Sequence, residues 1–507
     1  MVIILLSLII IISAFLRAYN IKSLPPGLYP DEAMNGNNAL EAISTGNWKI
    51  FYPENNGREA LFINIQALSI KALGNEPWAL RVVSAIFGIL TVLGVYFLAK
   101  ELFSKLRTTH YGLQTEEKIP LNQKIALLSA FLIATSFWHI MFSRIGFRAI
   151  MAPFFLTWAL YFFLKALRTQ KWLFYGIISG IVYGLGMHSY IAYRATPLLI
   201  MVIFGMWFFK HKESRKAALK TFIVFVIFSF LAFAPLGYYF LKNPADFMGR
   251  TSQVSVFSSE TPLKDLALNT VKTLGIFGIV GDYNWRHNYS GRPALFWPVG
   301  FIFLIGSLFG LISIFKKRVN DRDETINFAS WILFSSLVIV SLPVVISNEG
   351  IPHALRSIIM IPPVFILAGF GGIWLYEFLK NYFGDFEHGV FKKFLFIASV
   401  LFLIFLPFNA YYEYFIAWGK NPNVQGAFAA DYVAIGRELN KLPAERPKYV
   451  IVEAPGINVR GIPMPSQTVM FITDTFTPDK QLKKNVYYKL SSQIKQIPEG
   501  SYTVIIR

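Results

Sequence analysis

The sequence contains no cysteine and few charged residues. None of its 507 residues is Cys and only 15% are charged, whereas soluble proteins carry about 25% charged residues. The absence of cysteine excludes disulfide bonds, thiolate nucleophiles and cysteine-ligated metal sites. The scarcity of charge, together with a mean hydropathy of +0.48, argues against an ordinary water-soluble enzyme and excludes intrinsic disorder.

Long apolar stretches are instead abundant, and 54% of the residues are hydrophobic. A helix needs about 20 mostly apolar residues to cross a bilayer. Eleven stretches reach or approach this length: 2–16, 82–99, 125–143, 149–164, 172–187, 195–209, 221–241, 293–315, 325–347, 357–376 and 394–412. We therefore expect an α-helical integral membrane protein with about 11 transmembrane helices.

Basic residues, which give a formal net charge of +19, gather in alternate connections between these stretches. The basic connections are 105–118, 165–171, 210–220, 316–322 and 380–393. The positive-inside rule places them in the cytoplasm. Segments 17–81, 242–292 and 413–507 then lie outside, so we expect a multi-pass protein of the plasma (inner) membrane with its active site and C-terminal domain extracytoplasmic. We expect no nucleic-acid partner.

The external segments are too long for simple loops. In the first, Pro30 suits a helix start, and a helix is predicted over Asp31–Thr45. Ala60–Ile70 is apolar but too short to span, so it is predicted to lie along the membrane surface.

After Lys420 the composition becomes that of a soluble domain. A helix is predicted over Asp431–Leu442, and strands over Tyr449–Val452, Thr468–Ile472 and Tyr502–Ile506. We therefore expect two domains, a membrane domain over 1–420 and a small α/β domain over 421–507.

Several basic residues lie in short external turns, against the topology rule. They are Arg144, Arg148, Arg194, His353 and Arg356. Each alone is compatible with a side chain that reaches out to the membrane interface. Because all three turns open at one membrane face, a ring of guanidinium groups there would suit a lipid phosphate.

Acidic, aromatic and amide residues occupy the same external side. Asp31 and Glu32 are compatible with a helix start, where acids favour the macrodipole, and with catalysis. The polar cluster 54–59 is compatible with a solvated loop, and 281–288 with an interfacial loop or with sugar binding. The residues predicted to contact substrate are Glu59, His188, Tyr190, Tyr193, Asp282, Arg286, His287 and His353.

These residues carry a family resemblance. An acidic pair after the first span, followed by Gly57-Arg58-Glu59-Ala60-Leu61-Phe62, resembles the polyprenyl-phosphate-sugar-dependent glycosyltransferases of the GT-C fold. The group it resembles most is the protein mannosyltransferase and aminoarabinose transferase superfamily (glycosyltransferase family 39). Further matching segments are 143–148, 188–194, 281–288 and 353–356 ahead of Pro362-Pro363.

The resemblance, which covers about residues 1–420, implies a membrane core with juxtamembrane helices over an external cavity. It implies a polyprenyl-phosphate sugar donor and places the catalytic base at Asp31. We expect Glu32 to support either Asp31 or the juxtamembrane helix, because two adjacent carboxylates rarely face the same point on a helix. Arg58 falls on the family's basic position and joins Arg144, Arg148, Arg194 and Arg356 as a donor phosphate ligand. Some members carry an acidic metal ligand where this chain has Gly57. A divalent metal therefore stays open, and no other cofactor is implied.

The predicted function is transfer of the sugar, with inversion, to an acceptor hydroxyl of a lipid, a protein or a cell-surface glycan. The protein is expected to be in contact with membrane lipids. As the lipid phosphate leaves, negative charge develops on it, and cations that bind it more tightly in the transition state would speed the reaction. A carboxylate can take the acceptor's proton. The alternatives are a multi-spanning transporter or flippase, a membrane scaffold, and a ligase or phosphoethanolamine transferase acting on a lipid phosphate.

Overall fold

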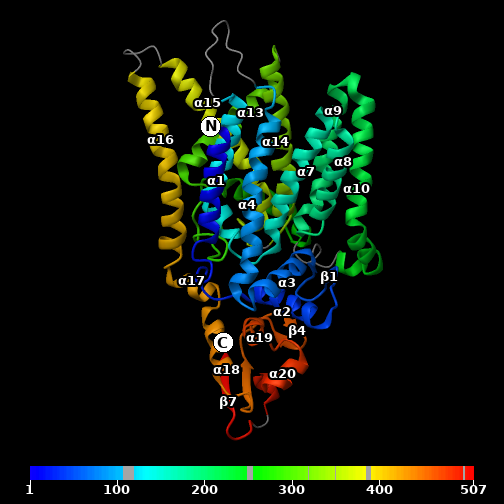
Figure 1. The fold of residues 1–507 in the computed structure, drawn as a ribbon, viewed down its shortest axis with the longest axis vertical. Coiled ribbons are helices and arrows are strands. Elements are labelled where there is room, and N and C mark those ends of the chain that lie inside the picture. The colour runs from blue at the N-terminus through cyan, green and yellow to red at the C-terminus, as the bar shows by residue number, and fades with distance from the viewer. Residues whose placement is uncertain (107–118, 248–254, 318, 349, 384–389, 495–496) are drawn as a thin grey trace.

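The computed structural model describes residues 1–507 apart from 107–118, 248–254, 318, 349, 384–389 and 495–496, so parts of the basic connections lie outside the described residues. Helices stand side by side in a tall bundle, and the C-terminal segment lies beneath one end of it (Figure 1). The N-terminus lies in the half of the bundle away from that segment, as the predicted orientation requires.

Long apolar helices form the bundle. Among the described residues, eight helical segments are long and apolar enough to cross a membrane. Their α-helices are α4 (Pro77–Leu102), α7 (Met151–Arg168), α9 (Thr196–Lys210), α10 (Arg215–Lys242), α13 (Trp297–Phe315), α14 (Asp321–Val345), α15 (Ile361–Tyr382) and α16 (Val390–Tyr411).

Three shorter apolar helices complete the bundle: α1 (Val2–Ala18), α5 (Leu121–Ala134) and α8 (Trp172–Gly186). They pack against the long ones, since α5 contacts α4 and α15, and α8 contacts α7 and α10. Each of the eleven predicted stretches therefore contains a helix, and the predicted helical membrane fold is confirmed.

Burial differs sharply between the helices and identifies the lipid-facing surface. The apolar window of α15 is 78% buried, whereas those of α10 and α16 are 17% and 11% buried. Exposed side chains on the two outer helices include Phe230, Leu241, Phe394 and Phe408. A soluble protein does not expose apolar surface on this scale, so this surface fits contact with lipid tails.

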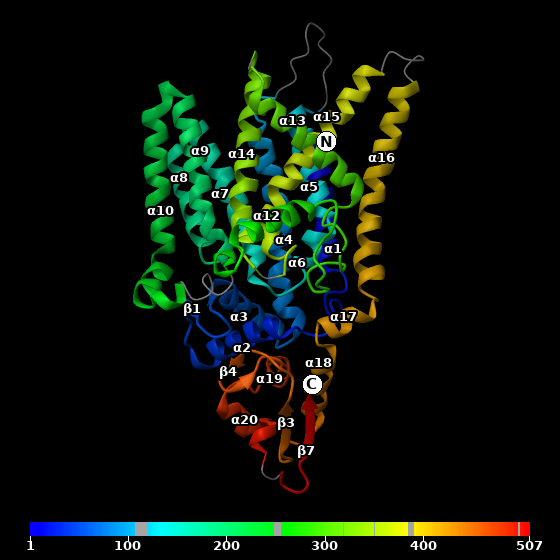
Figure 2. The ribbon, with the colours of Figure 1, turned by 180° about the vertical axis from the view of Figure 1, so that it is seen from behind.

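A juxtamembrane layer lies between the bundle and the C-terminal segment (Figure 2). It contains α2 (Pro30–Thr45), the hairpin β1 (Phe51–Tyr52) and β2 (Arg58–Glu59), and α3 (Leu61–Leu73). The two predicted helices of this region are confirmed. Helix α2 starts with Pro30 in its first turn and ends at Gly46, whose φ of +73° closes the helix in the left-handed region.

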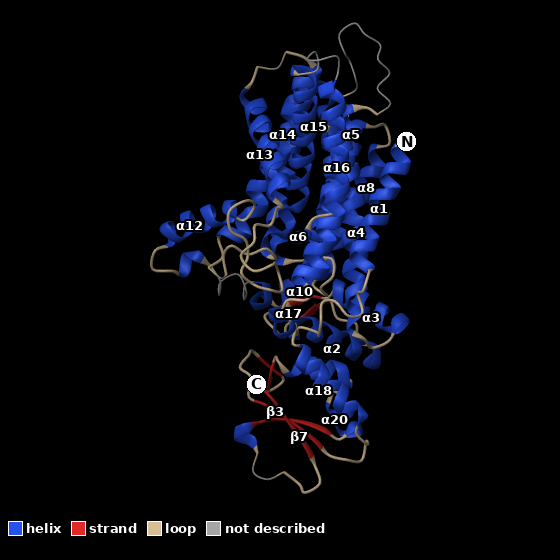
Figure 3. Cartoon of the chain, turned by 90° about the vertical axis from the view of Figure 1, so that its left-hand side faces the viewer, coloured by secondary structure: helices blue, strands red, loops and turns tan. Residues whose placement is uncertain are grey.

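Short elements line the same side of the bundle. They are α6 (Phe137–Phe142), η1 (Arg148–Ile150), η2 (Ile191–Ala195), η4 (Val256–Ser258), η5 (Arg356–Met360), the π-helix η7 (Tyr412–Trp418), and α12 (Pro262–Gly275). Helix α12 projects sideways from the bundle (Figure 3). At the opposite end, η3 (Lys212–Ser214) joins α9 to α10.

The C-terminal segment contains a three-stranded parallel sheet in the order β6-β3-β7. Its elements are α17 (Pro422–Ala427), α18 (Ala430–Lys441), β3 (Lys448–Val452), β4 (Asn458–Val459), β5 (Ile462–Pro463), α19 (Ser466–Thr473), α20 (Pro478–Lys484), β6 (Val486–Leu490), η8 (Ser491–Gln493) and β7 (Tyr502–Ile506). The expected α/β composition is present. The boundary at 421 stays a prediction.

One predicted strand of this segment is wrong. Thr468–Ile472 lies inside helix α19, where Thr468, Val469 and Phe471 are fully buried. The helix packs between α2 and α18. A short apolar run is compatible with either a buried strand or a buried helix. Here packing on both sides stabilises the helix, although the residues have a high β-propensity.

Candidate active site

A polar cavity of about 560 Å³ opens between the juxtamembrane layer, the bundle and the C-terminal segment. Asp31 and Asn35 reach it from α2, Arg58 from β2, and Arg148 and Tyr190 from turns at the end of the bundle. Residues from segments 426–432, where α17 meets α18, and 455–465 form the wall on the C-terminal side. The cavity therefore lies where three parts of the chain that are distant in sequence meet.

The adjacent acids Asp31 and Glu32 point in different directions. Asp31 is half-buried, lines the cavity, and its Oδ1 accepts a 2.6 Å hydrogen bond from Asn55 Nδ2. Glu32 is fully buried, and each of its oxygens lies 3.1 Å from an Arg81 nitrogen. Its Oε2 also accepts the Gly146 N–H at 2.6 Å. Asp31 thus faces the cavity, whereas the contacts of Glu32 join α2 to α4 and to the 143–148 turn.

Arg58 is held at the cavity by neutral partners. Its side chain is almost completely buried, and it donates to Asn35 Oδ1 at 2.7 Å and to Asn38 Oδ1 at 2.5 Å. Burial, followed by the neighbouring charge of Arg148, lowers the pKa of Arg58 to about 10. Amide oxygens orient the guanidinium without cancelling its charge, so the site suits an anion.

Arg148 and Arg194 share one carboxylate. Glu59 Oε2 lies 2.9 Å from Arg148 Nε, and Glu59 Oε1 lies 3.4 Å from a terminal nitrogen of Arg194. Arg148 also lines the cavity, with its guanidinium 5.9 Å from the centre of the Tyr190 ring. Glu59 therefore pairs with both cations, of which Arg148 lines the cavity.

Arg144 does not join this group. Its buried guanidinium donates to the carbonyl oxygens of Leu16, Tyr19 and Leu24 at 3.2, 2.8 and 2.9 Å. It also lies over the rings of Tyr414 and Phe415. These contacts fix the end of α1 to η7, so the structure does not bring Arg144 into the predicted ring of phosphate ligands.

The other residues predicted from the turns of the bundle also differ in whether they lie at the cavity. His188 Nε2 lies 3.0 Å from the Ala232 carbonyl, and burial lowers the pKa of His188. Tyr193 is fully buried beside Tyr183. Arg356 begins η5 directly after Leu355, which lines the cavity. Of the tyrosines predicted to contact substrate, the structure places Tyr190 at the cavity.

The 281–292 loop brings a second group of predicted residues together. His287 Nδ1 and His353 Nδ1 lie 3.2 and 3.7 Å from Asp282 Oδ2. Burial alone raises the pKa of Asp282, but the hydrogen bond and charge of His287 outweigh burial and lower it. Burial lowers the pKa of His287. This cluster of Asp282, His287 and His353 has the composition of a metal-binding site.

Arg286, from the same loop, stacks on Tyr29, with its guanidinium carbon 3.7 Å from the centre of the ring. Tyr29 lines the polar cavity. Burial lowers the pKa of Arg286 to about 10.

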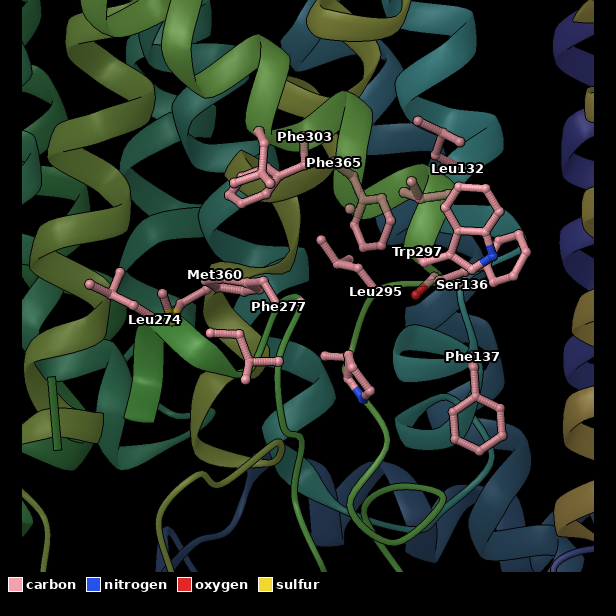
Figure 4. Close-up of a pocket in the computed structure, with 18 of the residues that line it drawn as sticks. Leu132, Ser136, Phe137, Leu274, Phe277, Leu295, Trp297, Phe303, Met360 and Phe365 are labelled. Carbon is pink, nitrogen blue, oxygen red and sulfur yellow. The ribbon is translucent and has the colours of Figure 1, made fainter. Parts of the chain in front are cut away.

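A larger cavity of about 1080 Å³ lies among α12, α13, α14 and α16. Its walls are mainly apolar and include Phe277, Trp297 and Phe303 (Figure 4). Near Asn288 and Tyr289, polar groups also line it, and Arg292 lies 3.6 Å from Glu413 there. Sequence analysis missed this polar rim, because the two residues are far apart in sequence and neither belongs to a motif.

Two asparagines at the site, Asn35 and Asn38, were also missed, and Asn55 was named only as part of the 54–59 cluster. Asn35 and Asn38 orient Arg58, and Asn55 binds Asp31. The 35/38 spacing places both side chains on one face of α2, which is a readable signal. The reach of Asn55 back to Asp31 depends on the tertiary path of the hairpin.

Comparison with known proteins supports the fold. Residues 117–239 match the family model described as dolichyl-phosphate-mannose-protein mannosyltransferase. The Archaeoglobus fulgidus oligosaccharyltransferase AglB, solved with an inhibitory peptide and a dolichol-phosphate, superposes with a TM-score of 0.54 at 16% identity, over 93% of this chain and 63% of that one. ArnT from Cupriavidus metallidurans, bound to undecaprenyl phosphate, gives 0.54 at 12% identity over 93% and 84%. The chain has the GT-C glycosyltransferase fold.

The predicted resemblance to the GT-C mannosyltransferase and aminoarabinose transferase group is therefore confirmed. This GT-C chain spans 63% of the length of the archaeal oligosaccharyltransferase. No curated protein sequence matches it significantly.

Proposed function

We propose that this GT-C protein transfers a sugar from a polyprenyl phosphate to an acceptor hydroxyl, with inversion at the anomeric carbon. The observation that carries the proposal is the convergence of Asp31, Arg58 and Arg148 on one polar cavity. A carboxylate and two cations that line one polar cavity suit attack by a neutral hydroxyl and departure of a phosphate.

In the proposed reaction the acceptor oxygen attacks the anomeric carbon as the bond from that carbon to the phosphate oxygen breaks. The electron pair of the broken bond stays with the lipid phosphate, which leaves as an anion. Asp31 takes the acceptor proton, and Asn55 fixes the orientation of the carboxylate through its 2.6 Å hydrogen bond. Arg58 and Arg148 stabilise the negative charge that grows on the phosphate.

The polyprenyl chain of the donor would bind in the apolar cavity. A polyprenyl chain is a long hydrocarbon, and it gains free energy when aromatic and aliphatic walls replace water around it. The cavity of about 1080 Å³ has such walls and a polar rim near the 281–292 loop. Arg286 of the same loop contacts Tyr29, which lines the polar cavity.

The proposed compartment is the outer side of a plasma (inner) membrane. The cavity and the C-terminal segment lie at the same end of the bundle (Figure 2). Basic residues such as Lys165, Arg168, Lys210 and Arg215 lie at the ends of α7, α9 and α10 away from that segment. The positive-inside rule assigns that end to the cytoplasm.

The test is transfer by the purified full chain, with lipid-phosphate release measured from synthetic polyprenyl-phosphate sugars. Asp31→Asn should lower kcat by about 10²–10⁴-fold while the protein remains folded and binds the lipid phosphate. Asp431→Asn is the matched control, because Asp431 occupies the first turn of α18 as Asp31 occupies that of α2. A turnover rate for Asp31→Asn within a few-fold of wild type would refute the assignment of the base.

A second arm tests the phosphate ligands. Arg148→Gln should raise the donor KM about tenfold or more, since a hydrogen bond to a charged group contributes about 1.5–3 kcal/mol. Arg437→Gln, on α18, is its control. Sugar that crosses a sealed vesicle without being attached to an acceptor would instead favour a transporter.

A further inference from the structure

Asp282, His287 and His353 form a compact group of potential metal ligands. One oxygen or nitrogen atom from each residue lies within 4.8 Å of the other two. The two imidazole rings stack with their centres 5.0 Å apart. Asp282 and His287 belong to the 281–292 loop, whereas His353 belongs to the turn before η5. The group therefore joins two segments that are far apart in sequence.

The distances match those of a tetrahedral transition-metal site. An ion with bonds of about 2.0–2.1 Å to its ligands holds neighbouring ligand atoms about 3.4 Å apart. The two distances from Asp282 Oδ2 to the histidine Nδ1 atoms, 3.2 and 3.7 Å, lie on either side of that value.

Backbone groups hold the carboxylate in position. Asp282 Oδ1 accepts the Asn284 N–H at 2.8 Å, and Oδ2 accepts the Ala354 N–H at 2.9 Å. Asn288 closes the loop by donating to the Asp282 and Arg292 carbonyls at 3.1 and 2.6 Å. Such outer contacts orient metal ligands before the ion binds.

Aromatic side chains cover His287. The rings of Phe142 and Phe147 pack on His287, and Trp138 donates to the Ala354 carbonyl. Asp282 is 4% and His287 7% exposed. A dry setting strengthens the attraction between a cation and a carboxylate.

The geometry points to a binding site for one transition-metal ion of the Zn²⁺ class, with Asp282, His287 and His353 as its protein ligands. Two imidazoles and one carboxylate favour zinc-like ions over Mg²⁺ or Ca²⁺, which prefer an all-oxygen shell. The ion ties the 281–292 loop to the turn before η5. Neighbours of these ligands line both cavities, with Leu355 at the polar one and Asn288 at the apolar one.

The site would thus fix the partition between the place proposed for the sugar and the place proposed for the lipid. It does not depend on the proposed function, because metal binding is measured without any substrate. The ligand set comes from segments 281–292 and 353, which are far in sequence from Gly57, where some members of the family that the chain resembles carry an acidic metal ligand.

The test uses the full chain purified without a histidine tag, with its metal content measured by mass spectrometry. The wild type should retain about one zinc-class ion per chain, and after exchange with Co²⁺ it should show the visible absorption of tetrahedral cobalt. His287→Gln and His353→Gln should each lower the metal content at least about fivefold. His211→Gln is the matched control, because His211 lies at the C-terminal end of α9, outside the cluster.

Two results would overturn the site. One is a wild-type protein that takes up no zinc or cobalt after chelation and reloading. The other is a His287→Gln or His353→Gln protein that keeps its ion. If either variant fails to fold, the cobalt spectrum and reloading stoichiometry of the wild type still decide, because nitrogen and oxygen ligation in a tetrahedron has its own signature.

Discussion

Replacement of Glu32 by glutamine tests whether the second acid of the pair has a structural role. Glu32 is the carboxylate partner of Arg81, whose side chain is 1% exposed. Arg81 also donates to the carbonyl oxygens of Pro25 and Gly27, at 2.6 and 2.9 Å. Glu32→Gln keeps the shape of the side chain but removes the charge, so the buried guanidinium retains only neutral partners.

The expected cost is large. Removal of one partner of a buried ion pair destabilises proteins by about 3–5 kcal/mol, because the remaining charge stays buried without compensation. Asp31→Asn changes a half-buried residue in the same helix turn, and surface-like changes of this kind cost about 0.5 kcal/mol. The two substitutions are isosteric and adjacent, so the contrast isolates the environment of each acid.

Thermal unfolding of the detergent-solubilised chain measures the contrast. Glu32→Gln should lower the apparent Tm by about 5 °C or more, and Asp31→Asn should change it little. The double variant Glu32→Gln/Arg81→Gln should be less destabilised than the sum of the single changes, since no charge is left unpaired. Unchanged Tm with lost turnover in Glu32→Gln would refute this reasoning and make Glu32 a catalytic residue.

Two further predictions concern the contact between the C-terminal segment and the site. Gly36→Ala should destabilise the chain by about 1–3 kcal/mol, because a Cβ at position 36 would lie 2.4 Å from the Phe471 ring. The measurement is Tm, which should be lower than in the control Gly205→Ala, where a Cβ has nothing within 4 Å. Arg460→Gln should raise hydrogen exchange of residues 53–58 about fivefold, for a loss of about 1 kcal/mol, because Arg460 forms ion pairs with two carboxylates of the juxtamembrane layer. Equal exchange in both proteins would contradict the second prediction.

The membrane core could be predicted from the sequence because its signal is strong and local. Each of the eleven apolar stretches contains a helix, since a bilayer requires long runs of apolar residues whatever their tertiary contacts. The C-terminal segment was harder. Its strand Val486–Leu490 was missed and the Thr468–Ile472 region was assigned to a strand, because short runs acquire their structure from the elements that cover them.

The arginines show a different limit of sequence analysis. Arg144 and Arg148 are four residues apart and would share a face if the helix continued. Helix α6 instead ends at Phe142, and Phe147 is extended, with φ −106° and ψ 129°. Because the helix is interrupted here, Arg144 donates to backbone carbonyl groups, whereas Arg148 lines the cavity. A helix boundary that shifts by a few residues therefore changes the role of a charged side chain.

The position of the site follows from the contacts that α2 makes with the parts of the chain around it. Glu32 joins the helix to the bundle, Asn35 and Asn38 hold Arg58, and Gly36 contacts the C-terminal segment. A polar helix can be buried in this way because each of these polar groups has a specific partner. Asp31 is the carboxylate of α2's first turn that these contacts leave facing the polar cavity. The same packing that stabilises the juxtamembrane layer thus sets the distance between the proposed base and the cations.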